Sequence, residues 1–336
     1  MKKMTSLCLI LLACACAVQA ASKPACPPPP SCDRECLRGM LTESLYSLLK
    51  HDTSKLPLSD KVRVTEDAVE KPLDKVGLVK TVTRLRGYRQ DFLDERGGMA
   101  TTAAVVEESG APILLVVRLE VVDQKITEVE MVATRSRKEG LIFNIDGLSA
   151  PSEEMNYAPR PEQLASRDDD LKAALHYPEG LNAAKTFAAV NAPFTPDAYR
   201  YENGQIMAGP DCKFAPGCQN ISTQSLAIFN RLGKVTTRVV GVDERMGIVL
   251  LRLNWGVREP TGDQLTAFEA FKVYDGHIHA VEAFIRILPL ELAKGGWDSS
   301  AERQVISNSH HLTQLTRMSA AHRDSRGLGI REYQVQ

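Results

Sequence analysis

The amino-acid sequence contains the same order of elements twice, and this internal repeat limits the chain to folds built from two similar units. Pro57 precedes a β-rich segment that ends at Glu66, and Pro193 precedes a β-rich segment that ends at Glu202. Both pairs of residues are separated by 136 positions. The equal spacing and the shared punctuation predict two copies of one small α+β unit.

A hairpin signal ends each copy. Two β-rich runs surround Asp123-Gln124 in the first copy and Asp275-Gly276 in the second, 152 positions later. Asp-Gly between such runs is a strong short-range signal for a hairpin. Because the separation has grown from 136 to 152, the second copy carries an insertion, and we expect part of it in residues 254–264.

Helical patterns and a change in composition divide the chain further. Asp33 is a candidate N-cap for a helix with an apolar stripe (Leu37, Leu41, Leu45, Leu48 and Leu49), and a second helix is expected around 181–188. A stretch rich in Pro, Ser and acidic residues predicts a linker. The expected domains are a first unit at 32–146, a linker at 147–170, a second unit at 171–298 and a polar tail at 299–336.

The N-terminus predicts export. A short basic start, an apolar run and the small-residue site Val18-Gln19-Ala20 are typical of a signal peptide at 1–20, followed by a Pro-rich leader at 21–31. Leu11-Leu12-Ala13-Cys14 also resembles a bacterial lipobox. We therefore expect a secreted or periplasmic protein or, alternatively, a lipoprotein anchored through Cys14.

The cysteines agree with an oxidising compartment. Cys212 and Cys218, with a Pro-Gly turn between them, predict a disulfide. The connectivity of Cys26, Cys32 and Cys36 stays open; a direct Cys32–Cys36 bond is expected to be awkward. No histidine lies at ligand spacing from these cysteines, so no metal site is predicted.

Overall charge excludes some partners. A formal net charge of -1 gives no field that would attract nucleic acid, and a membrane is expected only if Cys14 is lipidated. No phosphate-binding or dinucleotide-binding motif is present, and no cofactor is expected. The expected partners are a small molecule and, through the sheet faces, another copy of the chain.

The segment from Phe271 to Ala283, in which two strands flank Asp275-Gly276 and the second strand ends in Glu282-Ala283, resembles the nuclear transport factor 2-like (NTF2-like, cystatin-like α+β) superfamily. The Cys-Asp-Arg-x-Cys-Leu start at Cys32 is similar to that of a group of exported tandem proteins of bacteria and fungi. The resemblance covers about residues 32–297. It implies an α+β fold of two tandem units, each a curved antiparallel sheet wrapped over helices. This superfamily contains SnoaL-type and ketosteroid-isomerase-type enzymes as well as non-catalytic subunits, so the fold alone does not select a function.

The hairpin turn also predicts a pair of carboxylates. A two-residue turn at Asp275-Gly276 gives three opposite pairs: Tyr274 with His277, Lys272 with His279, and Glu269 with Glu282. Two buried glutamates facing each other would have separated pKa values, so that one acts as a base and the other as an acid. The first copy has Val117 opposite Glu130 at this place, so only the second copy is expected to be catalytic. The alternative is a structural role, with Arg286 neutralising Glu282.

Further polar residues are candidates for substrate binding: Arg252 and Asn254 inside the cone of the second unit, Glu202 and Asn203 near the pocket mouth, and His279. Each has a structural alternative, such as a solvated arginine, a strand-holding role shared by Glu66 and Glu202, or packing of His279. Tyr88 is expected on a helix. The leading hypothesis is a cofactor-independent lyase, isomerase or hydratase, and the alternative is a non-catalytic module that binds a ligand or another protein.

Overall fold

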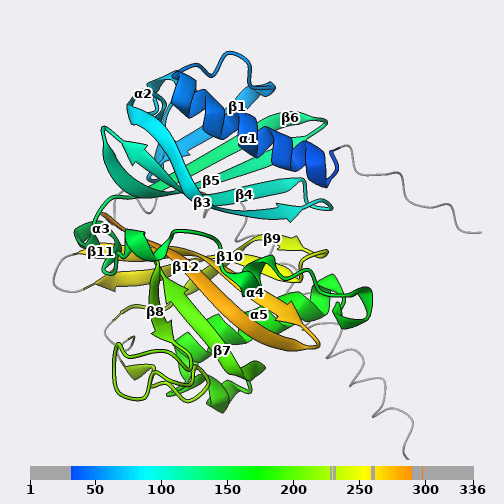
Figure 1. The fold of residues 1–336 in the computed structure, drawn as a ribbon, viewed down its shortest axis with the longest axis vertical. Helices are drawn as coiled ribbons and strands as arrows, with labels where there is room; N and C mark the ends of the chain where they lie inside the picture. The colour runs from blue at the N-terminus through cyan, green and yellow to red at the C-terminus, as the bar shows by residue number, and fades with distance from the viewer. Residues whose placement is uncertain (1–31, 228, 230–231, 259–261, 290–296, 298–336) are drawn as a thin grey trace, which may run out of the picture.

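The computed structural model describes residues 32–227, 229, 232–258, 262–289 and 297. They form an α+β protein with two six-stranded sheets, one in each sequence copy (Figure 1). The predicted signal peptide, the leader with Cys26, the lipid site at Cys14 and the tail at 299–336 lie outside the described residues. No described helix is long and apolar enough to cross a membrane.

The first unit begins with a long helix, continues into six strands and ends in a short helix. Its elements are α1 (Arg34–Lys50), β1 (Leu58–Glu66), β2 (Val69–Glu70), α2 (Leu78–Thr81), β3 (Val82–Asp94), β4 (Met99–Glu108), β5 (Ala111–Val122), β6 (Lys125–Thr134) and α3 (Arg137–Gly140), with a 3-10 turn at Leu73–Lys75.

The second unit repeats this order. A connecting segment contains α4 (Glu153–Asn156) between 3-10 turns at Ile145–Gly147 and Pro161–Gln163. The unit itself consists of α5 (Arg167–Ala183), a 3-10 turn at Phe187–Val190, β7 (Phe194–Glu202), β8 (Gln205–Ala208), β9 (Thr236–Asp243), β10 (Ile248–Arg258), β11 (Asp263–Tyr274) and β12 (His277–Pro289).

The two sheets have equivalent strand orders, β2-β1-β6-β5-β4-β3 and β8-β7-β12-β11-β10-β9. They are mixed, whereas purely antiparallel sheets were expected, because β1 pairs with β6 and β7 pairs with β12 in parallel. In each unit the strand after the long helix therefore pairs with the last strand of the sheet.

The sheets pack against each other, and the helices cover their outer faces. One apolar core lies between α1 and the first sheet, and a second lies between α5 and the second sheet. A third core, which includes Phe92 and Phe284 with ring centroids 6.2 Å apart, lies between the two sheets. In Figure 1 the first unit lies above the second. The four layers bury both faces of both sheets.

The helices follow from capping and apolar spacing. Asp33 accepts a hydrogen bond from the backbone N–H of Cys36, as an N-cap does, and the predicted leucine stripe of α1 faces the core. The second helix was misplaced: α5 begins at Arg167 after the N-cap Ser166, and the residues expected to be helical around Phe187 form only a 3-10 turn. The prediction of a helix at Tyr88 was also wrong, since Tyr88 lies on β3.

A β-bulge changes the register of the second hairpin. Tyr274 lies opposite His277 as predicted, but His279 is an extra residue between two paired positions. Because side chains alternate between faces, one extra residue moves every later side chain to the other face. Glu269 therefore lies opposite Ala283, not Glu282, and Lys272 opposite Ala280, not His279.

The first hairpin contains the same bulge, at Thr127. Its register places Val117 opposite Met131 and Arg118 opposite Glu130, which also corrects the expected pairing of Val117 with Glu130. With both bulges in place, Glu130 and Glu282 occupy equivalent positions 152 residues apart. The two copies can therefore be compared residue by residue.

The insertion in the second copy lies mainly in another place than expected. Glu66 and Asp94 are 28 positions apart, whereas Glu202 and Asp243, at the equivalent strand ends, are 41 apart. Most of the extra residues thus lie between β7 and β9 and not in 254–264. The predicted Cys212–Cys218 disulfide closes a loop in this segment.

A second disulfide corrects an expectation at the start of the first unit. Cys32 and Cys36 are bonded to each other, with their Cα atoms 5.3 Å apart. The bond is possible because Cys32 precedes the N-cap and is not itself helical, so the chain can bend back over the first turn of α1. Both disulfides are compatible with an extracellular or periplasmic location.

Two aspartates join the units by equivalent contacts. Asp94, at the end of β3, accepts hydrogen bonds from both Nη atoms of Arg167, at 2.9 and 2.5 Å, and from the backbone N–H of Val242 at 3.0 Å. Arg167 is the first residue of α5, so the first unit holds the helix of the second.

The reverse contact uses Asp243, at the end of β9. It accepts hydrogen bonds from both Nη atoms of Arg34, the first residue of α1, at 2.7 and 2.9 Å, and from the backbone N–H of Leu93 at 3.2 Å. In each unit, therefore, an aspartate at a strand end binds the arginine that begins the long helix of the other unit. This exchange has the form of an interface between two identical subunits, here within one chain.

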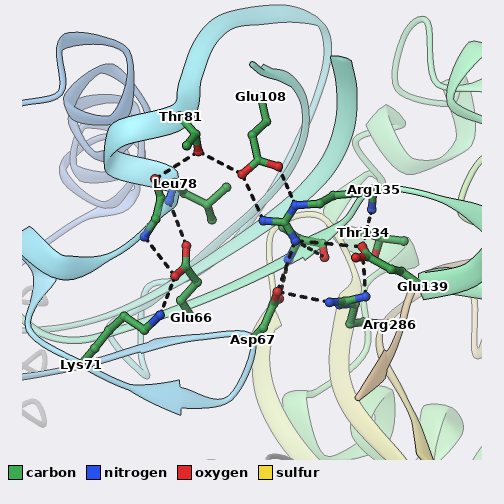
Figure 2. A network of polar contacts seen from close by, with 12 residues as sticks. Glu66, Asp67, Lys71, Leu78, Thr81, Glu108, Thr134, Arg135, Glu139 and Arg286 are labelled. Atoms are coloured by element: carbon green, nitrogen blue, oxygen red, sulfur yellow. Dashed lines mark hydrogen bonds and ion pairs between the residues drawn. The ribbon is translucent and has the colours of Figure 1, made fainter. Parts of the chain in front are cut away.

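A polar network closes the other end of the interface (Figure 2). Asp67, from the first unit, accepts hydrogen bonds at 3.3 Å from Arg135 and from Arg286 of β12. Arg286 also forms an ion pair with Glu139 at 3.0 Å. Arg286 is thus committed to partners other than Glu282, contrary to the structural alternative considered for it.

Candidate functional site

A cavity of about 460 Å³ lies where the two units meet, mostly between the connecting segment and the second unit. Tyr88 reaches it from β3 of the first unit, and Ser152 lies at the N-terminus of α4. Tyr199 and Tyr201 come from β7, and Glu282 comes from β12. The cavity is within the usual size range of small-molecule sites.

The carboxyl group of Glu282 is buried in the wall of this cavity. It accepts hydrogen bonds from the Ser152 hydroxyl at 2.7 Å and from the Tyr88 hydroxyl at 3.3 Å, and Ser152 accepts one from Tyr199 at 2.9 Å. Burial raises the pKa of Glu282, and the two hydrogen bonds oppose that shift only in part. A buried carboxyl group with a raised pKa, in the wall of a cavity, is a candidate for proton exchange with a bound molecule.

The equivalent residue of the first unit has the opposite environment. Glu130 accepts hydrogen bonds from Arg118 at 2.9 Å and from Arg238 at 2.7 Å, and Arg252 lies 3.9 Å away. Burial alone would raise the pKa of Glu130, but the three arginines outweigh it and lower the pKa to about 2. At Glu282 the position of Arg118 is taken by Ala270. The two copies thus differ at this position: arginines neutralise the charge of Glu130, whereas Glu282 has an alanine in the place of Arg118.

All the charged residues described in the wall of the cavity are acidic. Besides Glu282, they include Glu153, Glu154, Asp197 and Asp211. None of the described lining residues is Lys, Arg or His. The rings of Tyr199 and Tyr201 meet edge to face, with centroids 5.1 Å apart and an interplanar angle of 80°. The cavity therefore combines negative charge with aromatic surface.

The structure does not bring the predicted substrate-binding residues together. Arg252 is on β10, but it faces the first unit, where it lies over the Phe268 ring at 4.6 Å and near Glu130. Asn254 follows on the same strand and is buried. The expectation that Arg252 lies inside the cone was wrong, because its face of β10 packs between the sheets.

Glu269 and Glu202 lie inside the second unit, on the opposite face from Glu282. Arg200 forms an ion pair with Glu202 at 2.9 Å and donates a hydrogen bond to the Tyr177 hydroxyl at 3.2 Å. Burial raises the pKa of Glu269 to about 8, although Arg200 and a hydrogen bond from Tyr177 act against it. The two glutamates proposed as an acid–base pair are therefore separated by the sheet, and that pairing is excluded.

The buried Glu269 predicts a pH-dependent stability. Its pKa is raised on folding, so the folded protein binds a proton that the unfolded chain loses, and stability falls as pH rises from about 4.5 toward about 8. Glu269→Gln is expected to remove this dependence on pH. Between pH 5.5 and 7.5 the free energy of unfolding of the wild type should fall by about 2 kcal/mol relative to that of the variant. Urea unfolding at several pH values measures it. Equal slopes for both proteins would contradict it.

Asn203 and His279 have structural contacts. The Asn203 side chain donates hydrogen bonds to the carbonyl groups of Ile142 and Ile285 and accepts one from the N–H of Ile285 at 2.7 Å, so it ties β12 to the segment after α3. His279 stacks on the Tyr274 ring, with centroids 3.5 Å apart, and burial lowers its pKa. Neither residue lines the cavity at Glu282.

Sequence reasoning missed Ser152, Tyr199 and Tyr201. Ser152 lies in the segment that was assigned as a linker, where the Ser-Glu-Glu sequence was a recognisable helix start. Tyr199 and Tyr201 alternate along a strand, which indicates that they share a face, but the partner of that face was not visible in the sequence.

The comparisons with known proteins find one matching family and several similar structures. Residues 163–285 match a family described as "Domain of unknown function (DUF8021)". No curated protein matches the chain.

Several solved structures are similar to about a third of the chain. A de novo designed protein with a curved beta-sheet is 20% identical, with a TM-score of 0.26, over 32% of this chain and 91% of its own. A steroid delta-isomerase from Pseudomonas aeruginosa is 13% identical, with a TM-score of 0.25, over 31% and 82%. A de novo designed NTF2 fold protein is 19% identical, with a TM-score of 0.24, over 32% and 90%. With identities and TM-scores this low, these likenesses carry no inference about activity.

Proposed function

We propose that the protein binds a small organic molecule in the cavity between its units and that Glu282 transfers a proton to or from it. The proposal is carried by one observation: a buried carboxyl group with a raised pKa lines a ligand-sized cavity and is held by two hydroxyl groups. Proton transfer by a positioned side chain is most effective when its pKa lies near the working pH.

The geometry suits Glu282 as a base. Ser152 donates a hydrogen bond to one carboxylate oxygen of Glu282, and Tyr88 donates one to the other. These two bonds fix the plane of the carboxylate and leave further lone pairs for the ligand. The Tyr199 hydroxyl extends this chain through Ser152. A reaction that needs only a proton shuttle and no cofactor is an isomerisation, elimination or hydration. The class agrees with the NTF2-like resemblance, and the signal-like N-terminus favours a reaction outside the cell or in the periplasm.

Deuterium exchange tests the proposal whatever the product of the reaction is. A mixture of small carbon acids is incubated with the protein in D₂O, and the loss of C–H signals is followed by proton NMR. Glu282→Gln is expected to reduce the exchange rate by about 10²-fold or more, the contribution typical of a general base. Glu269→Gln, on the other face of the same sheet, is the matched control.

The two variants separate the possible outcomes. Exchange that survives in Glu282→Gln but not in Glu269→Gln would move the chemistry to the interior of the second unit. Tyr88→Phe removes a hydrogen bond that favours the ionised carboxyl group, so the pKa of Glu282 rises further and the rate is expected to climb at higher pH than in wild type.

A non-catalytic ligand-binding module is the second candidate. The observation that favours it is the separation of Glu269 and Glu282 by the sheet, which leaves Glu282 without the second carboxylate of the predicted pair. In that case a ligand would raise the melting temperature of the protein while no C–H signal is lost.

A further inference from the structure

We propose that the molecule bound between the units is an organic cation, a protonated or quaternary amine. The inference rests on the proposed function, because it names the class of ligand for the same cavity. Three features of the described residues carry it: the sign of the charges in the wall, the lack of a cation at Glu282, and the aromatic surface beside it.

The wall of the cavity carries charge of one sign. Five of its described residues are acidic and none is basic. Asp197, Asp211 and Glu153 are exposed at the surface, whereas Glu282 is only 5% exposed. A concave surface lined by one sign of charge concentrates the opposite sign, and it excludes anions such as carboxylates and phosphates.

Glu282 is a buried carboxyl group without a cation. Among the described residues, its contacts come from the neutral hydroxyls of Ser152 and Tyr88, and no basic side chain contacts its oxygens. A buried carboxylate is usually paired, as Glu130 is with three arginines at the equivalent position. Without such a partner the pKa of Glu282 is raised, and a bound cation would stabilise its ionised form. Ala270 stands opposite Glu282 where the first copy has Arg118 opposite Glu130. We therefore infer that a positively charged ligand can bind beside Glu282.

The aromatic surface suits the rest of such a ligand. Tyr199 and Tyr201 stand edge to face on one strand, and Tyr88 lines the same cavity from the first unit. Methyl or methylene groups around a positive nitrogen pack well on tyrosine rings, and the ring faces attract the charge. A metal ion would not use these rings, and the described residues contain no group of metal-binding side chains.

A pair of equal-sized probes tests the inference. Choline and its neutral isostere 3,3-dimethylbutan-1-ol are titrated into the full chain, and binding is measured by calorimetry and by the NMR shifts of the probe. Choline is expected to bind at least about tenfold more tightly than the isostere, a difference of about 1.4 kcal/mol. Glu282→Gln is expected to remove most of this preference. Asp123→Asn, which removes an exposed carboxylate in a distant turn, is the matched control.

Variants of Tyr201 provide a second measurement. Tyr201→Phe keeps the ring and is expected to bind choline more tightly than Tyr201→Ala. Equal affinity for choline and the isostere, or no binding of choline at millimolar concentrations, would overturn the inference. The proposed proton transfer is measured separately, by C–H exchange. If exchange depends on Glu282 but the cavity does not prefer choline to the isostere, only the ligand class is refuted. If the cavity prefers choline but no C–H exchange occurs, only the catalysis is refuted.

Discussion

Replacement of Glu130 by glutamine is expected to lower the free energy of unfolding by about 3–5 kcal/mol, the cost of breaking a buried ion pair by removing one partner. The change keeps the size of the side chain but removes the negative charge between Arg118, Arg238 and Arg252, all of them buried. Because these guanidinium groups stay charged, they repel one another in the core of the interface.

Denaturant unfolding with intrinsic fluorescence measures this loss. Glu128→Gln is the matched control, since Glu128 pairs with Arg118 at 2.7 Å but its side chain is 29% exposed, and less than about 1 kcal/mol is expected from it. The pKa of Glu130 is lowered to about 2 on folding, so its contribution is present above about pH 4.5 and is lost as pH falls toward 2. A loss below about 1 kcal/mol at pH 7 for Glu130→Gln would contradict the assignment.

The exchanged aspartates predict a second large effect. Asp94→Asn and Asp243→Asn each weaken the hold of one unit on the other unit's helix, and each is expected to cost about 2–3 kcal/mol, less than a fully buried pair because the arginines are partly exposed. The double variant is expected to lose about 4–6 kcal/mol if the two sites act independently.

The two single variants serve as controls for each other. If the two contacts are equivalent and independent, the single variants lose similar free energies of unfolding, and the double variant loses their sum within about 0.5 kcal/mol. A large loss in one and none in the other would show that the contacts are not equivalent. Hydrogen exchange at β3 and β9, the strands that carry the two aspartates, reports whether the units separate before they unfold.

The sequence was sufficient for the architecture because repeats and turns are local signals. The spacing of Pro57 and Pro193 located the two copies, and Asp275-Gly276 located the hairpin turn. The bulge at His279 was not predictable, because it leaves no signature in residue type. Its effect was large: one extra residue placed Glu269 and Glu282 on opposite faces of the sheet.

The candidate site was less predictable than the fold. Tyr88, Ser152, Tyr199 and Glu282 come from four separate segments. Tyr199 and Glu282 lie on the paired strands β7 and β12, but Tyr88 reaches them only because the two sheets pack face to face. The sequence shows that strand faces are apolar, but it does not say which faces meet. The comparison of copies remains useful after correction, since Val117 and Glu269 are equivalent in the observed register as well.

The fusion of two units into one chain has a consequence for how such an interface can change. In a homodimer every substitution occurs twice, so a glutamate left without its arginine on one side would be left without it on the other. Here the arginine beside Glu130 and the alanine beside Glu282 are encoded separately. One half of the interface can therefore keep the units together while the other half is free to diverge.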